Sequence, residues 1–451
     1  MVVGAPGSGD GKTTVATGLM AALGRRGMRV AGHKVGPDYI DPGYHALATG
    51  RVGRNLDPWL TAEELVVPLF LHGARGADIA VVEGVMGLYD GMRGAGDFAS
   101  TAHVARLLDA PVVLVVDATG QGQSVAALVH GFASYDTRVR LAGVILNRVG
   151  SPRHEEVCRE ALEGTGVSVL GVIPRASGAS TPSRHLGLIP AAERRAEARE
   201  AIDSLATLIE SSCDLPGIIA LANDTSPLTA TPWNPADAID AAETDPLPAE
   251  SSTSKSQGAP RVAVAGGSAF TFGYAEQAEL LVAAGAEVVS FDPLRDEDLP
   301  EGTRGVILPG GFPEVYAADL SGNEMLLRRM KEFAASGGVI VAECAGLLYL
   351  SRELDGHPMC GILDAKAEMT PSLTLGYRNA VAVRDSVVTK AGERYRGHEF
   401  HRTVCTSPSD PVWRWTDGAD GYASGRVLAS YLHLHWAGSP ALARRFVEEC
   451  R

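Results

Sequence analysis

The chain has 451 residues, 45% of them hydrophobic, and a formal net charge of −14. The length predicts roughly two to four domains, and the negative charge disfavours nucleic acids and anionic membranes as partners. The six cysteines form no CxxC pair, which argues against a disulfide framework or a structural zinc site and favours a reducing, cytoplasmic location. We expect neither a signal peptide nor a membrane-spanning run.

Residues 1–215 alternate short apolar runs with helix-like runs. A strand is predicted at 1–3, and the clearest later strands are Ile79–Val82, Val112–Val116 and Ala142–Leu146. Short, β-branched strands of this kind are typical of a parallel sheet buried on both faces. This half is therefore predicted to be a doubly wound α/β domain that ends in a helix over residues 191–211.

The first strand leads into a glycine-rich loop that ends in Gly11-Lys12-Thr13-Thr14. Glycines allow backbone N–H groups to wrap a phosphate chain, while Lys12 would reach the outer phosphates and the Thr13 hydroxyl would ligate Mg²⁺. Pro6 departs from the strict pattern, which has glycine there. The predicted phosphate-binding residues are Gly9, Asp10, Gly11, Lys12, Thr13 and Thr14.

Acidic residues follow two strand-like runs, where the ligand crevice of an α/β sheet lies. Asp38 and Glu83 are predicted, with Thr13, to ligate Mg²⁺, because this ion prefers hard oxygen ligands and takes few of them from protein. Capping of a loop is the alternative role for these carboxylates. For Asp41 and Asp90 the two roles are evenly balanced.

Composition changes in the middle of the chain. Residues 216–260 contain seven prolines and a Ser/Thr cluster, which indicates a linker that is disordered in part. A second α/β pattern begins with the strand-like run Arg261–Ala265 and continues to the end. We therefore predict domains at 1–215 and 261–451, joined by a linker at 216–260.

Cys344 lies in a tight turn between a strand-like run, Gly338–Ala342, and a helix-like run, Leu347–Leu350. Such a turn lifts a nucleophile clear of the sheet and places it at the positive end of a helix, which favours the thiolate. The alternative is a buried cysteine that packs as a small hydrophobic residue.

Several long segments together resemble the cobyrinic acid a,c-diamide synthase family. The resemblance covers nearly the whole chain except the linker. Its motifs are His33–Pro42 with His45, Asn55–Asp57, Glu83–Gly91, Pro182–Leu188, Pro309–Glu314, Ala342–Cys344, Leu375–Arg378, Gly397–His401 and Ser430–His435.

For the C-terminal half, the resemblance implies a class I glutamine amidotransferase domain. Cys344 would attack the side-chain amide of glutamine, His433 would act as the base, and backbone N–H groups near Gly311 and Ala345 would form an oxyanion hole. Ala345 replaces a glycine of the family pattern and should be tolerated if its φ is negative. His435 stands where the class I triad has glutamate, so a Cys–His dyad is expected.

For the N-terminal half, the resemblance implies an amide synthetase domain related to dethiobiotin synthetase. ATP would phosphorylate a corrin carboxylate, and ammonia would then displace phosphate. The pair Asn147-Arg148 is expected to contact adenine, with loop capping by Asn147 as the alternative, while Arg54, Arg93 and Arg175 are weaker candidates for substrate contact. The expected substrate contacts are Lys34, Tyr39, Ile40, Asp41, His45, Asp90, Arg184 and His185.

The sequence leaves several alternatives open. The ring could hold cobalt, nickel (as in nickel-sirohydrochlorin) or no metal, and cobyric acid synthase is a sister enzyme that amidates other arms. From a different class, the N-terminal half could be a P-loop nucleotide switch carrying a non-catalytic amidotransferase-like domain. A homodimer is one option for the oligomeric state, which the sequence does not fix.

Overall fold

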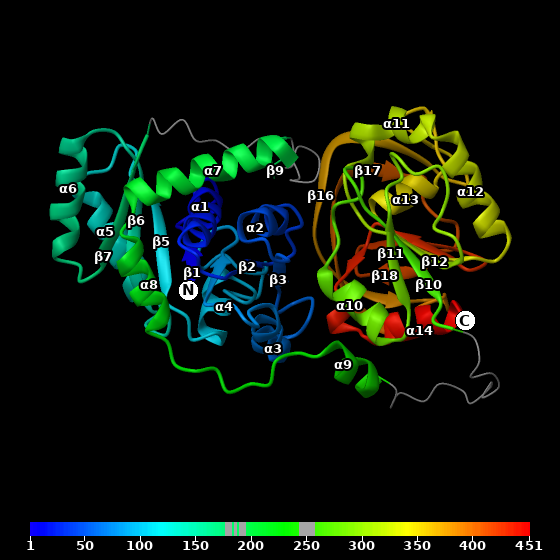
Figure 1. Ribbon diagram of the computed structural model, residues 1–451, viewed down its shortest axis with the longest axis horizontal. Coiled ribbons are helices and arrows are strands. Elements are labelled where there is room, and N and C mark those ends of the chain that lie inside the picture. Colours follow the sequence, from blue (N-terminus) through cyan, green and yellow to red (C-terminus); the bar gives the residue numbers. More distant parts are fainter. Residues whose placement is uncertain (176–182, 185–186, 189–194, 243–257) are drawn as a thin grey trace. The chain divides into compact units, whose positions relative to one another are not determined.

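The computed structural model describes residues 1–175, 183–184, 187–188, 195–242 and 258–451. They form two compact units, Met1–Trp233 and Asn234–Arg451, each of which combines a parallel sheet with helices (Figure 1). The predicted α/β class with two sheet domains is confirmed. Within the described residues, no helix combines the length and apolar character needed to cross a bilayer.

The first unit is built on a seven-stranded parallel sheet in the order β3-β2-β4-β1-β5-β6-β7. Strands β1 and β2 are buried along their whole length, as expected of strands covered on both faces. The strands are β1 (Val2–Gly4), β2 (Val30–Val35), β3 (Arg54–Leu56), β4 (Ile79–Glu83), β5 (Val112–Asp117), β6 (Leu141–Val149) and β7 (Ser168–Pro174).

Helices connect these strands, and α7 packs against α1 (Figure 1). Contact is close because Gly18 of α1 has no side chain: a Cβ there would lie 2.6 Å from Cγ1 of Ile209. The helices of this unit are α1 (Lys12–Arg25), α2 (Asp41–Thr49), α3 (Glu63–Gly73), α4 (Thr101–Leu107), α5 (Ser124–Tyr135), α6 (Pro152–Glu163), α7 (Arg195–Ser212) and α8 (Leu215–Asn223). Two short strands, β8 (Ser183–Arg184) and β9 (Gly187–Leu188), form an antiparallel pair.

The second unit contains a six-stranded sheet in the order β11-β10-β12-β13-β21-β20. All neighbours are parallel except β20 and β21. The strands are β10 (Arg261–Ala265), β11 (Glu287–Phe291), β12 (Thr303–Leu308), β13 (Val339–Glu343), β20 (Tyr422–Ser424) and β21 (Val427–Ser430).

A further seven-stranded sheet in this unit was not predicted. Its centre is the long antiparallel pair of β16 and β17, and β22 pairs with β17. Buried and exposed residues alternate irregularly along β16, so it lacks the continuous apolar run that marks a parallel strand. The strands are β14 (Glu353–Leu354), β15 (His357–Pro358), β16 (Lys366–Ala382), β17 (Arg394–Cys405), β18 (Trp413–Trp415), β19 (Gly418–Asp420) and β22 (His433–Leu434).

Part of the expected linker is helical. Helices α8 and α9 occupy described parts of residues 216–260, and the two units divide at Trp233 and Asn234. The predicted domain boundaries themselves stay a prediction. The helices of the second unit are α9 (Pro235–Ala242), α10 (Ala275–Ala283), η1 (Pro313–Tyr316), α11 (Ala317–Gly322), α12 (Glu324–Ala335), α13 (Ala345–Leu350), η2 (Trp436–Gly438) and α14 (Ala441–Glu449).

Sheet register brings distant segments of the first unit together. Glu83, the last residue of β4, is the register partner of Lys34 on one side and of Val3 on the other. The glycine-rich loop that follows β1 therefore begins beside Glu83. This edge is formed by the carboxyl ends of parallel strands, where α/β proteins bind ligands.

Candidate functional site

The glycine-rich loop between β1 and α1 is held closed by its own polar groups. Gly9 and Gly11 adopt left-handed φ values of 87° and 106°. The N–H of Gly7 donates to Oδ2 of Asp10 at 2.7 Å, and Nζ of Lys12 donates to the carbonyl of Gly7 at 2.7 Å. Burial, followed by the charge of Lys34, lowers the pKa of Lys12 below its ordinary value. A bound phosphate would replace the carbonyl as partner of the Lys12 ammonium.

Asn147 and Arg148, at the end of β6, secure the same loop. Nδ2 of Asn147 donates to the carbonyl of Asp10 at 2.8 Å. Arg148 donates to the carbonyl of Gly9 at 2.8 Å and pairs with Asp117 at 2.5 Å. In this structure Asn147 thus acts as the loop-capping residue of the sequence analysis, while its contact with adenine stays a prediction. The hydrogen bond from Arg148 to the glycine-rich loop was not predicted.

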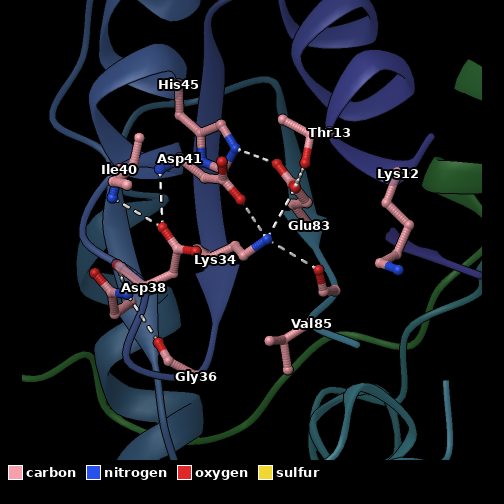
Figure 2. A network of polar contacts seen from close by, with 12 residues as sticks. Lys12, Thr13, Lys34, Gly36, Asp38, Ile40, Asp41, His45, Glu83 and Val85 are labelled. Atoms are coloured by element: carbon pink, nitrogen blue, oxygen red, sulfur yellow. Dashed lines mark hydrogen bonds and ion pairs between the residues drawn. The ribbon is translucent and has the colours of Figure 1, made fainter. Parts of the chain in front are cut away.

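Glu83 is the centre of a buried polar network in the first unit (Figure 2). Its carboxylate is fully buried and accepts hydrogen bonds from Oγ1 of Thr13 at 2.5 Å and Nζ of Lys34 at 2.9 Å, while its second oxygen lies 2.7 Å from Nε2 of His45. Burial alone would raise the pKa of Glu83, but Lys34 and then His45 outweigh it and hold this pKa well below its ordinary value. Glu83 therefore stays ionised.

Lys34 is the cation of this network and contacts three acceptors. Besides Glu83, its ammonium lies 2.5 Å from Oδ2 of Asp41 and 3.1 Å from the carbonyl of Gly84. Burial lowers the pKa of Lys34, but the neighbouring carboxylates act against burial and raise this pKa above its ordinary value. Burial and the charges of Asp38 and Glu83 raise the pKa of Asp41, because two buried carboxylates share one ammonium.

The side chain of Asp38 accepts hydrogen bonds from backbone groups of its own loop. Its Oδ1 accepts the backbone N–H groups of Ile40 and Asp41 at 2.8 and 2.9 Å, as the dashed lines in Figure 2 show. The preceding turn is fastened by Nδ2 of Asn55, which donates to the carbonyls of Gly36 and Asp38. Loop capping is therefore the role that Asp38 has here, and metal binding by Asp38 stays a prediction.

The remaining residues that were expected to contact the substrate do not share one environment. Tyr39 and Ile40 are buried, and His45 faces Glu83 with no exposed surface. Oδ2 of Asp90 accepts the N–H of Gly87 at 2.9 Å, so it closes a turn. Arg184 belongs to β8, and His185 lies outside the described residues.

The Mg²⁺ expected from the sequence requires hard oxygen donors. Thr13 and Glu83 bring a hydroxyl and a carboxylate oxygen within 2.5 Å of each other beside the loop, and both are the hard donors that Mg²⁺ prefers. Among the described residues, no three or more His, Cys, Asp and Glu side chains gather as a metal-binding group. A hydroxyl and a carboxylate are suitable ligands for an ion that takes few of its ligands from protein, and their binding of Mg²⁺ stays a prediction.

In the second unit, Cys344 occupies a strained turn between β13 and α13. Its φ of 48° and ψ of −98° are unusual for a residue with a side chain. The turn is fixed by the N–H of Cys344, which donates to the carbonyl of Ser430 at 2.7 Å, and a Cβ on Gly346 would lie 2.4 Å from the carbonyl of Leu308. Ala345 begins α13 without a positive φ, so its methyl group is tolerated.

The surroundings of Cys344 act against the expected preference for the thiolate form. Burial, together with the charges of Glu314 and Glu343, raises the pKa of Cys344 well above its ordinary value. The backbone N–H groups of Ala345 and Gly311 bond to the sulfur and oppose this shift. The thiolate would therefore need a partner that accepts the proton or supplies positive charge.

His433 borders the same turn as the cysteine. It begins β22 and is fully buried, and a Cβ on Gly310 would lie 2.4 Å from its Cε1. Gly310 thus contacts His433, while its neighbour Gly311 faces the sulfur of Cys344. Both expected catalytic side chains therefore contact the segment Gly310-Gly311. Gly311 has no room for a side chain, because a Cβ there would clash with the carbonyl oxygen of Ala269.

A carboxylate near His433 was not predicted. Oε2 of Glu343, the residue before the nucleophile, lies 3.6 Å from Nδ1 of His433. His435 occupies the usual triad position and pairs instead with Glu276, 3.7 Å away, while stacking on Tyr274. The only sequence signal for Glu343 was an acidic residue ending an otherwise apolar strand.

Comparison with known proteins agrees with this pair of sites. Residues 1–189 match the CobQ/CobB/MinD/ParA nucleotide binding domain, and residues 261–441 match the CobB/CobQ-like glutamine amidotransferase domain. The chain is 58% identical to the hydrogenobyrinate a,c-diamide synthase of Streptomyces coelicolor, over 100% of this chain and 97% of the relative. It is 53% identical to that of Mycobacterium bovis (99% and 97% covered) and 44% identical to the cobyrinate a,c-diamide synthase of Gloeobacter violaceus (100% and 96%).

The Glu83 network yields a stability prediction. Replacing Lys34 by methionine leaves Glu83 and Asp41 buried without their cation, and breaking such a pair costs about 3–5 kcal/mol. Hydrogen exchange measured by mass spectrometry should therefore become faster in peptides that cover β2 and β4. The control is Arg29→Met, which removes an exposed ion pair with Asp78 and should change exchange little. Equal exchange in the two variants would contradict the prediction.

Proposed function

The chain belongs to the hydrogenobyrinate and cobyrinate a,c-diamide synthase family, and we propose that it uses ATP and glutamine to convert two acetate side chains of hydrogenobyrinate into amides. The observation that carries this proposal is that one chain contains both required centres. A phosphate loop lies beside the Thr13–Glu83 pair, and a strained cysteine faces two backbone N–H groups. Neither centre alone performs glutamine-dependent amide synthesis.

In the proposed glutaminase reaction, Cys344 gives its proton to His433 and attacks the amide carbon of glutamine. The carbonyl oxygen becomes an oxyanion, which the N–H groups of Gly311 and Ala345 would stabilise. The carbon–nitrogen bond then breaks, ammonia leaves with a proton from His433, and a glutamyl thioester remains. Water hydrolyses the thioester to glutamate and restores the thiol.

In the proposed synthetase reaction, a substrate carboxylate oxygen attacks the γ-phosphorus of ATP and displaces ADP. The Lys12 ammonium would leave the carbonyl of Gly7 for the outer phosphates, where it balances developing charge. Thr13 and Glu83 would hold Mg²⁺, which draws charge from the phosphates when bound. Ammonia then attacks the acyl carbon, phosphate leaves with the carboxylate oxygen, and an amide is formed. Phosphorylation is needed because a carboxylate is a poor electrophile.

The ring is proposed from the relatives' names. Relatives that are 53–58% identical carry the name hydrogenobyrinate a,c-diamide synthase, whereas those named for cobyrinate are 39–44% identical. We therefore favour the metal-free ring as the substrate.

Replacing Cys344 by alanine separates the two reactions. Glutamine-dependent diamide formation should fall by ~10³-fold or more, because the nucleophile is lost. Activity with ammonium chloride and Mg²⁺-ATP should persist, measured as diamide by liquid chromatography and mass spectrometry. Cys360→Ala is the matched control, because Cys360 is equally buried in the same unit but lies outside the turn. Loss of the ammonia-dependent activity in a folded Cys344→Ala protein would contradict the two-centre account.

The choice of ring has a separate test. Initial rates with ammonium chloride should give a higher kcat/KM for hydrogenobyrinate than for cobyrinate, since the synthetase centre alone selects the ring. Using ammonia removes the glutaminase from the comparison. A higher kcat/KM for cobyrinate would overturn the proposed ring and leave the reaction type intact.

A further inference from the structure

The catalytic pair of the second unit lacks the carboxylate that normally follows the histidine, because that position is His435. We propose that Glu343, the residue directly before the nucleophile, takes its place as the positioning residue for His433. This inference rests on the proposed glutaminase roles of Cys344 and His433.

Contacts on both sides of the Glu343 carboxylate place it against the histidine segment. Oε2 lies 3.6 Å from Nδ1 of His433, and Oε1 accepts the N–H of Leu434 at 3.4 Å. One carboxylate therefore touches two successive residues of β22. The 3.6 Å separation is longer than a hydrogen bond, and such catalytic contacts often shorten when substrate binds.

The backbone holds the two residues in this relation. Glu343 ends β13 and is the register partner of Ser430 at the end of β21. The carboxylate of Asp420 accepts the Ser430 hydroxyl at 2.7 Å and the N–H of Tyr431 at 2.6 Å, which fixes the turn that leads to His433. Glu343 and Cys344 are adjacent in sequence, so the acid and the nucleophile are positioned by the same strand end.

The low exposure of both side chains strengthens the contact between Glu343 and His433. The His433 side chain is fully buried, and that of Glu343 is 12% exposed. Glu343 also lines a small internal cavity with Leu432, Leu434 and Trp436, so little water screens its charge. A carboxylate at Nδ1 favours the tautomer that leaves Nε2 to take the thiol proton, and it stabilises the imidazolium that forms.

Glu343 has an opposing effect that makes the proposal testable. Its charge, like that of Glu314, raises the pKa of the Cys344 thiol. If Glu343 acted only as a nearby charge, removing it would make the thiol more reactive, as removing Glu314 should. A positioning role predicts the opposite result for Glu343, because formation of the thiolate depends on the protonated histidine.

The experiment compares Glu343→Gln with Glu314→Gln in the full chain. Glutamine replaces the carboxylate with an amide of the same shape, whose oxygen can still accept from Leu434. For Glu343→Gln we expect kcat for glutamate release to fall by about 10- to 100-fold with KM nearly unchanged, a smaller loss than the ~10⁴-fold that follows removal of a fully hydrogen-bonded triad carboxylate. Alkylation of Cys344 by iodoacetamide should slow in Glu343→Gln and be unchanged or faster in Glu314→Gln.

Two results would overturn the proposal: wild-type glutamate release by Glu343→Gln, or an equal loss in both variants. If Glu343→Gln does not fold, Glu343→Asp keeps the charge but withdraws it from His433, and a wild-type rate there would likewise overturn it. Glutamate release that survives Cys344→Ala would refute the glutaminase role itself. Release that is lost in Cys344→Ala but intact in Glu343→Gln would refute only the positioning role.

Discussion

A fully buried carboxylate, that of Glu83, constrains the whole arrangement of the first unit. Removing an ionised carboxylate from water is costly unless partners replace the lost hydration. Glu83 finds those partners in Thr13 of the phosphate loop, Lys34 of β2 and His45 of α2. Three segments are thereby tied to the end of one strand. The same contacts join the Thr13 hydroxyl to the Glu83 carboxylate, the two groups proposed to hold Mg²⁺.

In the second unit, the electrostatic environment of Cys344 differs from that of Glu83. Burial and two nearby carboxylates disfavour the thiolate of Cys344. The strained turn aims the sulfur at backbone N–H groups, and His433 lies against the adjoining glycine. In the proposed glutaminase reaction, the thiolate forms when His433 accepts the proton.

Local patterns in the sequence predicted much of this. The strands around Ile79–Val82 and Val112–Val116, the phosphate loop and the turn at Cys344 all lie where short apolar runs and glycines indicated. The antiparallel sheet of β16 and β17 was missed, because partly exposed strands lack a continuous apolar run. The partners of Glu83 depend on the register of β2 against β4, and no local pattern contains that information. For the same reason, nothing in the sequence showed that Glu343 faces His433.

The central claim is that phosphoryl transfer to a substrate carboxylate drives amide formation. The most direct measurement starts from hydrogenobyrinate labelled with ¹⁸O in its carboxylates, incubated with Mg²⁺-ATP and glutamine. The phosphate released is then analysed by mass spectrometry. The account predicts that one ¹⁸O atom is carried into phosphate for each amide formed. Phosphate that contains no ¹⁸O, with ATP consumed and diamide produced, would contradict it.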